Sequence, residues 1–429
     1  MEDNTETREN ATPKEETEDA LLTVFRGIQS LSSNLRTDTP RVAPYSEEWI
    51  DGFKGTGLVA TVKLQPGSVI IQEIAMIIKD NPDGFVSWAE YDIMIGQELR
   101  TMPNDWKRKF FEIPAIGEDI KGKFAARFDF ACIPCDSDGR QLKILGMAAR
   151  NLNHGCIPNA YMTFSFARTP ASIIVRACKN IEAGEEITIP YCFTHGEYSE
   201  RQSETMRKFG FQCACRDCLY PKDEIEGNIG FVCTYLPLLM SQATIEKYPA
   251  VSLKFLYGIL RAYTDVGVYD GRYTYLLVHA AYICAHHSDA GRATWFLRMA
   301  QAFYLVIETV DSSHYALTEQ WLREPTKIAG WGQSTRGFSD ARDVKIIEEA
   351  GSRALGVAFM LYAKDNAYIT LEEHATIEDN LARKIINDGH LSQIINELQQ
   401  EKDEEAKVKR QQNMKKKRNK NRKKNGGRK

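Results

Sequence analysis

Three cysteines lie within six residues near the middle of the chain, at Cys213, Cys215 and Cys218. Thiolates at such short spacing are ligands that Zn²⁺ prefers, but a closed structural zinc site needs four of them. The first twenty residues are charged, and no apolar run reaches the ~18 residues of a membrane span. We therefore expect a reducing compartment, where clustered cysteines bind metal more often than they form disulfides. The cysteines predict three ligands of one zinc ion, with a fourth from elsewhere in the chain.

Two polar segments precede the cysteines. One runs Asn153-His154-Gly155-Cys156-Ile157-Pro158-Asn159, and the other runs Gly184-Glu185-Glu186-Ile187-Thr188-Ile189-Pro190-Tyr191. Taken alone, each has an ordinary explanation. An Asn-His pair is common in hydrogen-bonded turns, and a tyrosine in a strand usually has a satisfied hydroxyl. Finding both segments in this order and at this spacing before the cysteines is much less common than finding either segment alone.

Together the three segments resemble the signature of the SET-domain protein lysine methyltransferases. That signature reads N-H-S-C-x-P-N, then G-E-E-[LI]-T-x-x-Y, then a C-x-C-x-x-C segment called post-SET. The resemblance covers roughly residues 45–220. It implies an enzyme that transfers a methyl group from S-adenosylmethionine (SAM) to a lysine of a protein substrate, histone or non-histone.

The resemblance also implies roles for individual residues. The hydroxyl of Tyr191 would lie where a lysine channel meets the cofactor pocket and would orient the methyl group and the amine. Asn153 and His154 would hydrogen-bond SAM, and Phe211 would pack against its adenine. The fourth zinc ligand would be Cys156, so that one zinc ion orders the lysine channel.

A glycine-rich segment precedes these motifs. Gly55, Thr56 and Gly57 lie in residues 54–61, and Pro66-Gly67 then leads into the apolar residues 69–71. This pattern predicts two strands joined by a turn, because glycine permits positive φ and close approach of a ligand. A lone Gly-x-Gly is usually only a turn. In the SET family, however, a G-x-G-[LV]-x-A segment at this place lines the SAM pocket, which implies cofactor contacts from Gly55, Thr56 and Gly57.

The chemistry sets a demand that any lysine methyltransferase must meet. The amine must be neutral to attack, and neutralising a lysine of pKa near 10.4 at pH 7 costs about 4.6 kcal/mol at ~1.36 kcal/mol per unit. A narrow apolar channel lowers that pKa by desolvation, and a cationic sulfonium acts in the same direction. Transfer in line from sulfur to nitrogen then depends on positioning.

Four residues depart from the family pattern. Gly155 stands in place of Ser, Pro190 precedes Tyr191, Asn151 replaces a frequent Phe, and Asp129 stands where related enzymes carry an Asn that contacts the cofactor. None removes a group that the chemistry requires. They leave open a second function, a catalytically weak SET-fold module that recruits protein or RNA partners through a helical domain and a basic tail. A tetratricopeptide-like scaffold would explain only the second half of the chain.

The remaining sequence predicts the elements around these motifs. Residues 75–125 read as mainly helical, an insert that in the family helps to form the substrate groove. Cys132 and Cys135 read as two buried thiols in a hairpin, because no second pair lies at zinc-ribbon spacing. No zinc finger of the MYND type is visible in the insert.

Helical periodicity dominates after Tyr220. Apolar residues recur at helical spacing, which predicts antiparallel helix pairs without a clean 34-residue repeat: Leu253, Leu256, Leu260, Tyr263, Leu276, Val278, Ala281, Ile283, Trp295, Leu297, Ala300, Phe303 and Ile307. Cys284, His286 and His287 are interpreted as ordinary core or surface residues and not as metal ligands.

The two ends of the chain differ in charge. Residues 1–20 carry eight acidic and two basic side chains. The chain has a formal net charge of -3, but residues 407–429 hold thirteen Lys and Arg and no acid, so the rest carries -16. We expect both ends to be disordered. A basic tail of this kind is typical of a nuclear localisation signal or of non-specific nucleic acid contact.

The fold class predicted is α+β: a β-rich SET fold with a helical insert and a zinc-binding post-SET segment, followed by a mostly α-helical, tetratricopeptide-like C-terminal domain. The domains expected are an acidic disordered tail (1–42), the SET and post-SET domain (43–220), a helical domain (221–400) and a basic disordered tail (401–429). We expect a nuclear or cytoplasmic location and no membrane contact.

Overall fold

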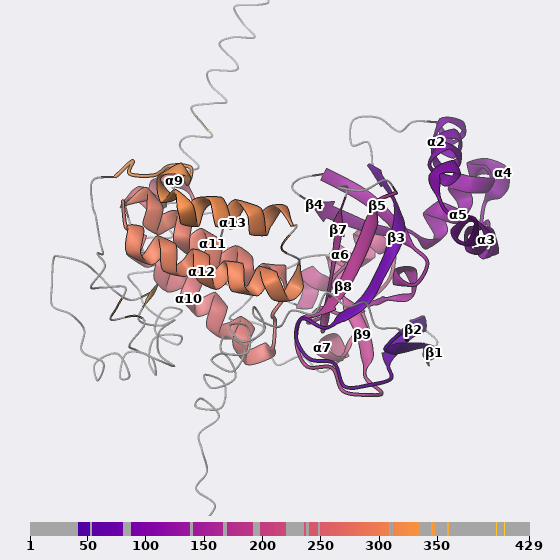
Figure 1. The fold of residues 1–429 in the computed structure, drawn as a ribbon, viewed down its shortest axis with the longest axis horizontal. Helices are drawn as coiled ribbons and strands as arrows, with labels where there is room; N and C mark the ends of the chain where they lie inside the picture. The colour runs from indigo at the N-terminus through magenta and orange to yellow at the C-terminus, as the bar shows by residue number, and fades with distance from the viewer. Residues whose placement is uncertain are drawn as a thin grey trace, which may run out of the picture.

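The computed structural model describes residues 42–51, 54–79, 87–137, 140–165, 170–191, 198–219, 240–247, 249–308 and 312–334, with a few isolated positions between and beyond them. These residues form a β-rich half (residues 42–219) and a helical half (residues 236–334), which lie side by side in Figure 1. The α+β class predicted from the sequence is confirmed. Nearly all of the two terminal tails, whose disorder was predicted, lies outside the described residues.

Two sheets make up the β-rich half. Their strands are β1 (Tyr45–Asp51), β2 (Gly55–Ala60), β3 (Val69–Lys79), β4 (Ile133–Ser137), β5 (Arg140–Gly146), β6 (Asn153–His154), β7 (Ala160–Ser165), β8 (Ser172–Ala177) and β9 (Glu186–Ile189). One sheet has the order β1-β2-β9-β6 and the other β4-β5-β3-β8-β7. The two sheets share one apolar core. The pair β6 and β9 is parallel, whereas the other described pairs are antiparallel.

The Pro66-Gly67 turn separates the two sheets. Gly67 adopts φ +85°, a conformation that glycine reaches without steric cost. The strands predicted on either side are confirmed as β2 and β3, but they join different sheets and do not pair with each other. The turn therefore passes the chain from the sheet that carries the glycine segment to the larger one.

Helices α2 (Trp88–Thr101), α3 (Asn104–Glu112), α4 (Glu118–Lys121) and α5 (Lys123–Ala131) form the insert. A capping box between Ser87 and Glu90 begins α2. The indole of Trp106 donates to the carbonyl of Ile74 at 3.0 Å, which fixes α3 against β3. The helical insert predicted for residues 75–125 is confirmed in type, but β3 extends to Lys79 and the first helix begins at Trp88.

The hairpin predicted around the C-x-x-C pair is also present. Strands β4 and β5 pair directly, and the backbone N–H of Cys132 caps the end of α5. The Cys132 thiol is only partly buried, where a buried thiol was predicted, and lies 3.8 Å from the carbonyl of Asp129. The side chain of Cys135 lies outside the described residues.

The helical half contains α9 (Gln242–Lys247), α10 (Pro249–Val266), α11 (Gly271–His286), α12 (Ala290–Ile307), α13 (Ser313–Arg323) and the short η2 (Pro325–Lys327). Asp270, Asp289 and Ser312 cap α11, α12 and α13, each accepting from a backbone N–H in the first turn. Except for Ile307, the predicted apolar positions belong to one core or pack against it. Cys284, His286 and His287 are buried within this half. None of the described helices is long and apolar enough to cross a membrane.

The two halves share a packed interface. Helix α12 lies against β7 and β8, where Cys178, Val306 and Ile307 form a small buried cluster. Ile157, one residue after the predicted ligand Cys156, packs against the core of the helical half. The segment with the candidate site residues is therefore part of the interface.

His279 on α11 predicts a dependence of stability on pH. Burial lowers the pKa of His279 to about 4 from 6.5, so the unfolded chain binds its proton more readily between these values. The stabilisation that neutral His279 gives the folded state is fully present above pH 6.5, and it is lost as the pH falls towards 4. We expect about 2 kcal/mol of this loss between pH 7 and pH 5.

His279→Gln should remove that part of the pH dependence, because glutamine does not titrate. Urea unfolding of both proteins at pH 7, 6 and 5 measures the difference. An unchanged slope of stability against pH in the variant would contradict the assignment.

Candidate functional site

The two polar segments, residues 153–159 and 184–191, meet where strands β6 and β9 run parallel. In β6 and β9, Asn153 lies opposite Thr188 and His154 opposite Ile189. Asn159 ties the far end of the first segment to the second: its amide donates to the Glu186 carbonyl at 2.8 Å and accepts from the Thr188 N–H at 2.9 Å. Because these bonds are buried or partly buried, they fix where the first segment crosses the second.

His154 links the predicted catalytic residue to a predicted metal ligand. The backbone N–H of Tyr191 donates to His154 Nδ1 at 3.1 Å, so the neutral ring carries its proton on Nε2. Nε2 lies 3.4 Å from the Sγ of Cys156. Burial lowers the pKa of His154 to about 4, which keeps the ring neutral at pH 7. The imidazole therefore joins the backbone of Tyr191 to the thiol of Cys156.

Tyr191 lies in an aromatic group at the end of β9. Its hydroxyl donates to the carbonyl of Leu152 at 2.5 Å, and its ring lies 5.3 Å from that of Phe209 and 6.5 Å from that of Phe211 between centroids. Burial raises the pKa of Tyr191, and Glu186 raises it further. The phenol is therefore protonated at physiological pH.

The glycine segment lies against Asn153. The Asn153 amide donates to the Glu186 carboxylate at 2.9 Å, and this carboxylate pairs with Lys54 at 2.5 Å. A Cβ on Gly57 would lie 2.6 Å from Ile50 Cγ1 and 2.8 Å from the Asn153 amide nitrogen. Gly57 is thus required for this close approach, and Gly55 has φ +71°. Thr56 is exposed, and its carbonyl accepts from Asn153 at 3.4 Å.

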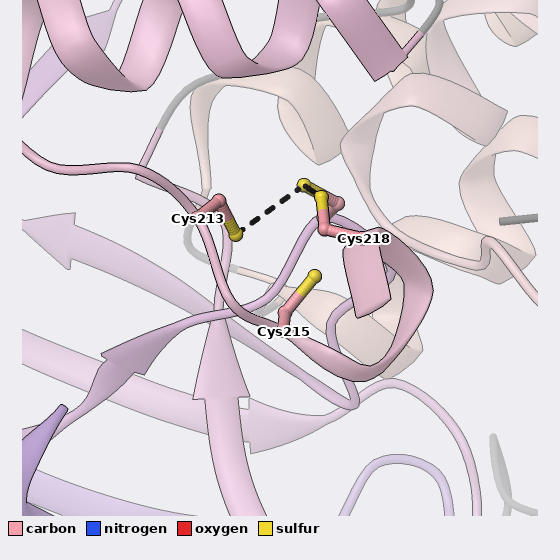
Figure 2. A group of neighbouring side chains, drawn as sticks. Cys213, Cys215 and Cys218 are labelled. Carbon is pink, nitrogen blue, oxygen red and sulfur yellow. Dashed lines mark hydrogen bonds between the residues drawn. The ribbon is translucent and has the colours of Figure 1, made fainter. Parts of the chain in front are cut away.

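The four predicted metal ligands converge. The Sγ atoms of Cys156, Cys213, Cys215 and Cys218 all lie within 4.8 Å of one another, and the four residues are buried. Cys156 Sγ lies 3.9 Å from that of Cys213 and 3.6 Å from that of Cys218. A tetrahedron of thiolates around Zn²⁺ at ~2.3 Å has edges of about 3.8 Å. Figure 2 shows Cys213, Cys215 and Cys218 directing their sulfur atoms into one space.

The thiols of this cluster share their protons. Hydrogen bonds to Cys213 and the other two thiols raise the pKa of Cys156, whereas hydrogen bonds to Cys156 and the other two thiols lower the pKa of Cys215. Four thiolates in one buried space repel one another, and a divalent cation among them offsets much of that repulsion. The donor set, the spacing and the burial therefore fit one zinc ion.

Helix α6 (Tyr198–Phe209) holds the cysteine segment (residues 211–219), which ends in the short helix α7 (Arg216–Leu219). The amide of Gln202 donates to the Cys213 carbonyl at 2.8 Å and accepts from the Cys213 N–H at 2.9 Å. The buried guanidinium of Arg201 lies 3.9 Å from Cys218 Sγ. These contacts place the three cysteines opposite Cys156.

Two of the departures have local explanations. Asp129 on α5 forms ion pairs with Lys121 and Lys143, and these cations hold its pKa low in spite of partial burial. Gly155 lies beside β9, where an added Cβ would be 2.7 Å from Thr188 Oγ1. A side chain at position 155 would therefore displace Thr188.

Sequence reasoning missed three residues of this site. Phe209 packs on Tyr191, and its place two residues before Phe211 was the available signal. Glu186 belongs to the Gly-Glu-Glu motif, but its bond to Asn153 becomes visible only in three dimensions. Lys54 precedes the glycine segment, and its partner Glu186 lies 132 residues away.

Comparison with known proteins identifies a SET domain in the β-rich half. Residues 55–192 match the SET domain family. Histone-lysine N-methyltransferase set5 of Schizosaccharomyces pombe is 25% identical over 279 residues, which cover 64% of this chain and 83% of that protein. Histone-lysine N-methyltransferase ASHR1 of Arabidopsis thaliana is 36% identical over 139 residues, 26% of this chain and 28% of that protein.

A shorter match involves a SET and MYND domain-containing protein of Dictyostelium discoideum, 37% identical over 68 residues. That match spans 16% of this chain and 19% of the Dictyostelium protein. The chain therefore spans most of the fission yeast relative but less than a third of the other two.

The sulfur geometry predicts that the purified protein holds zinc. We expect about one zinc ion per chain by elemental analysis, and a loss of most of it in Cys215→Ser, because three thiolates do not close a tetrahedral site. Melting temperature should fall with the metal, since binding contributes to folding.

Cys284→Ser provides the matched control, since Cys284 is also buried but lies in the helical core. This variant should keep its zinc even if it is less stable. Full zinc content in Cys215→Ser, or no zinc in the unsubstituted protein, would exclude the site.

Proposed function

We propose that this chain, whose residues 55–192 match the SET domain family, is a SET-domain protein lysine methyltransferase that transfers the methyl group of SAM to a lysine amine of a protein substrate. One observation carries the proposal. Tyr191, the Asn153-His154 pair and the four-cysteine cluster come from three distant segments and meet in one place. Methyl transfer depends on holding the reacting groups in place, and these residues are held by burial and hydrogen bonds.

Burial at the site favours neutral groups. The pKa of His154 is lowered and that of Tyr191 is raised, in both cases first because burial penalises the charged form. A lysine side chain inserted beside them would meet the same penalty, which lowers its pKa. The amine would thereby lose its proton before transfer, as the reaction requires.

Tyr191 acts as a positioning hydroxyl in this mechanism. Its raised pKa keeps the phenol protonated, so it does not serve as the base that accepts the lysine proton. Its O–H is held by the Leu152 carbonyl, which leaves the lone pairs of the oxygen to orient the incoming groups. Phe209 and Phe211 supply aromatic walls that exclude water.

The glycine segment and the crossing segment would hold SAM, which supplies an electrophilic methyl group on a sulfonium. Gly55, Thr56 and Gly57 offer backbone, and Asn153 offers its amide. Both ring nitrogens of His154 are engaged within the protein, so a cofactor contact from this residue would come from its main chain. Phe211 would pack against the adenine.

Zinc would order the cysteine segment beside Tyr191 in this proposal. Phe211 leads directly into Cys213, and His154 joins Cys156 to the Tyr191 backbone. Metal binding therefore holds the aromatic wall as well as the cysteines. The names of the relatives favour a histone substrate and a nuclear role. The basic tail, which also suits nucleic acid contact, supports the same location.

Tyr191→Phe tests the proposed chemistry. We expect transfer of radiolabelled methyl from SAM into proteins of a cell extract to fall by about two orders of magnitude, the typical cost of removing one well-placed polar group at a reaction centre. Fold and zinc content should not change, because the ring stays in place.

Tyr273→Phe is the control, a buried tyrosine of the helical half that should retain full activity. Equal labelling by Tyr191→Phe and the unsubstituted protein would contradict the role of the hydroxyl. Absence of labelling by every protein, with SAM binding lost, would favour the binding module.

Gly57→Ala tests the proposed cofactor segment. The added methyl would displace the Asn153 amide or Ile50, since it would lie closer than 3 Å to both. We expect SAM affinity in calorimetric titration to fall at least about tenfold, which corresponds to ~1.4 kcal/mol.

Gly258→Ala is the matched control, because a methyl at this position of α10 meets no atom within 4 Å. It should bind SAM normally and be slightly more stable. Unchanged SAM binding by Gly57→Ala would remove the segment from the cofactor site.

A further inference from the structure

A buried ion pair lies at the start of α11. Asp270 caps this helix, accepting from the Arg272 N–H at 2.9 Å. The guanidinium of Arg272 donates to the same carboxylate through Nε at 3.0 Å and through a second nitrogen at 2.7 Å. Asp270 is 0% exposed and Arg272 is 5% exposed. Two bonds in one plane fix the guanidinium in one orientation.

The guanidinium also reaches across to the β-rich half. Arg272 donates to the backbone carbonyl of Cys156 at 2.9 Å, a contact between residues 116 positions apart. Cys156 is the one cysteine of the described cluster that lies outside the cysteine segment. The helical half is therefore bonded directly to a candidate metal ligand.

Other contacts seat the start of α11 on the same surface. A Cβ on Gly271 would lie 2.7 Å from the Tyr161 hydroxyl, so a glycine is needed for the close approach of helix and strand β7. The ammonium of Lys179 donates to the Gly267 carbonyl at 3.5 Å. Ile157 packs into the helical core beside these contacts.

The division of the cysteine cluster makes the position of Cys156 decisive. Three thiols lie within six residues and stay together as a unit, but they form a closed site only when Cys156 stands opposite. His154 Nε2 contacts the Cys156 thiol, and the Arg272 guanidinium donates to the Cys156 carbonyl. Without Arg272, that buried carbonyl would lose its charged donor.

We propose that Arg272, oriented by Asp270, is a positioning residue for the zinc centre, so that the helical half determines how tightly the β-rich half retains its metal. The inference rests on the proposed zinc site. Arg272 acts by holding the Cys156 backbone where its thiol completes the four ligands. Partners of this kind outside the metal's own ligands change affinity by about 10- to 100-fold.

A second ion pair in the same half provides a matched comparison. Asp289 caps α12 and binds Arg292 at 2.6 Å, and both side chains are buried. Arg292 donates to the Ala358 carbonyl at 3.3 Å, so this pair has the same design but holds a different carbonyl. Loss of either pair should destabilise the helical half, but only the first should affect zinc.

The experiment compares two double variants of the full-length, zinc-loaded protein, Asp270→Asn with Arg272→Met and Asp289→Asn with Arg292→Met. Asparagine retains the helix cap, and the paired change leaves no buried charge without its partner. Zinc release to excess of a chromogenic chelator is followed at a temperature where circular dichroism shows both variants folded.

The first variant should release zinc about tenfold faster or more, and the second should match the unsubstituted protein within about twofold. Equal release from the two double variants would overturn the proposal and leave Asp270 and Arg272 a purely structural role. An unsubstituted protein without zinc would instead refute the zinc site itself.

Discussion

Asn153 and His154 run parallel to Thr188 and Ile189, whereas the other described strand pairs are antiparallel. A hairpin turn cannot join two parallel strands. The chain must therefore leave the sheet after His154 and make a crossover before it returns as β9, which runs in the same direction. The residues after His154 therefore cross over the second segment instead of extending it. Asn159 and His154 supply the hydrogen bonds that hold this crossing, and the candidate site lies where it occurs.

The polar groups at the crossing are neutral for one physical reason. Burial penalises a charged imidazole and a charged phenolate alike, so His154 is deprotonated while Tyr191 retains its proton. Neutrality gives His154 one donor and one acceptor nitrogen, and it uses both. The same desolvation that sets these bonds would deprotonate a lysine amine, so the structural and chemical requirements of the site agree.

How well each feature can be predicted from the sequence depends on how far apart along the chain its residues lie. The helices of the second half have strong periodicity, and every predicted apolar position except Ile307 belongs to their core or packs against it. The four cysteines were grouped by resemblance, and the structure brings them together. The assignment of β2 and β3 to different sheets could not be predicted, because local pattern specifies a strand but not its partners. The bond from Arg272 to Cys156 has no local signal at all.

The proposed zinc site would join two segments that have little reason to stay together without the metal. The cysteine segment is short, and its helix α7 spans only Arg216–Leu219, so its own backbone bonds repay little of the entropy of ordering it. Coordination to Cys156 would supply that missing free energy, but only if Cys156 is itself fixed. It is fixed by β6 through His154 and by α11 through Arg272. In this proposal the β-rich half depends on the helical half for the order of its candidate site, even though none of the candidate catalytic or cofactor-binding residues lies in the helical half.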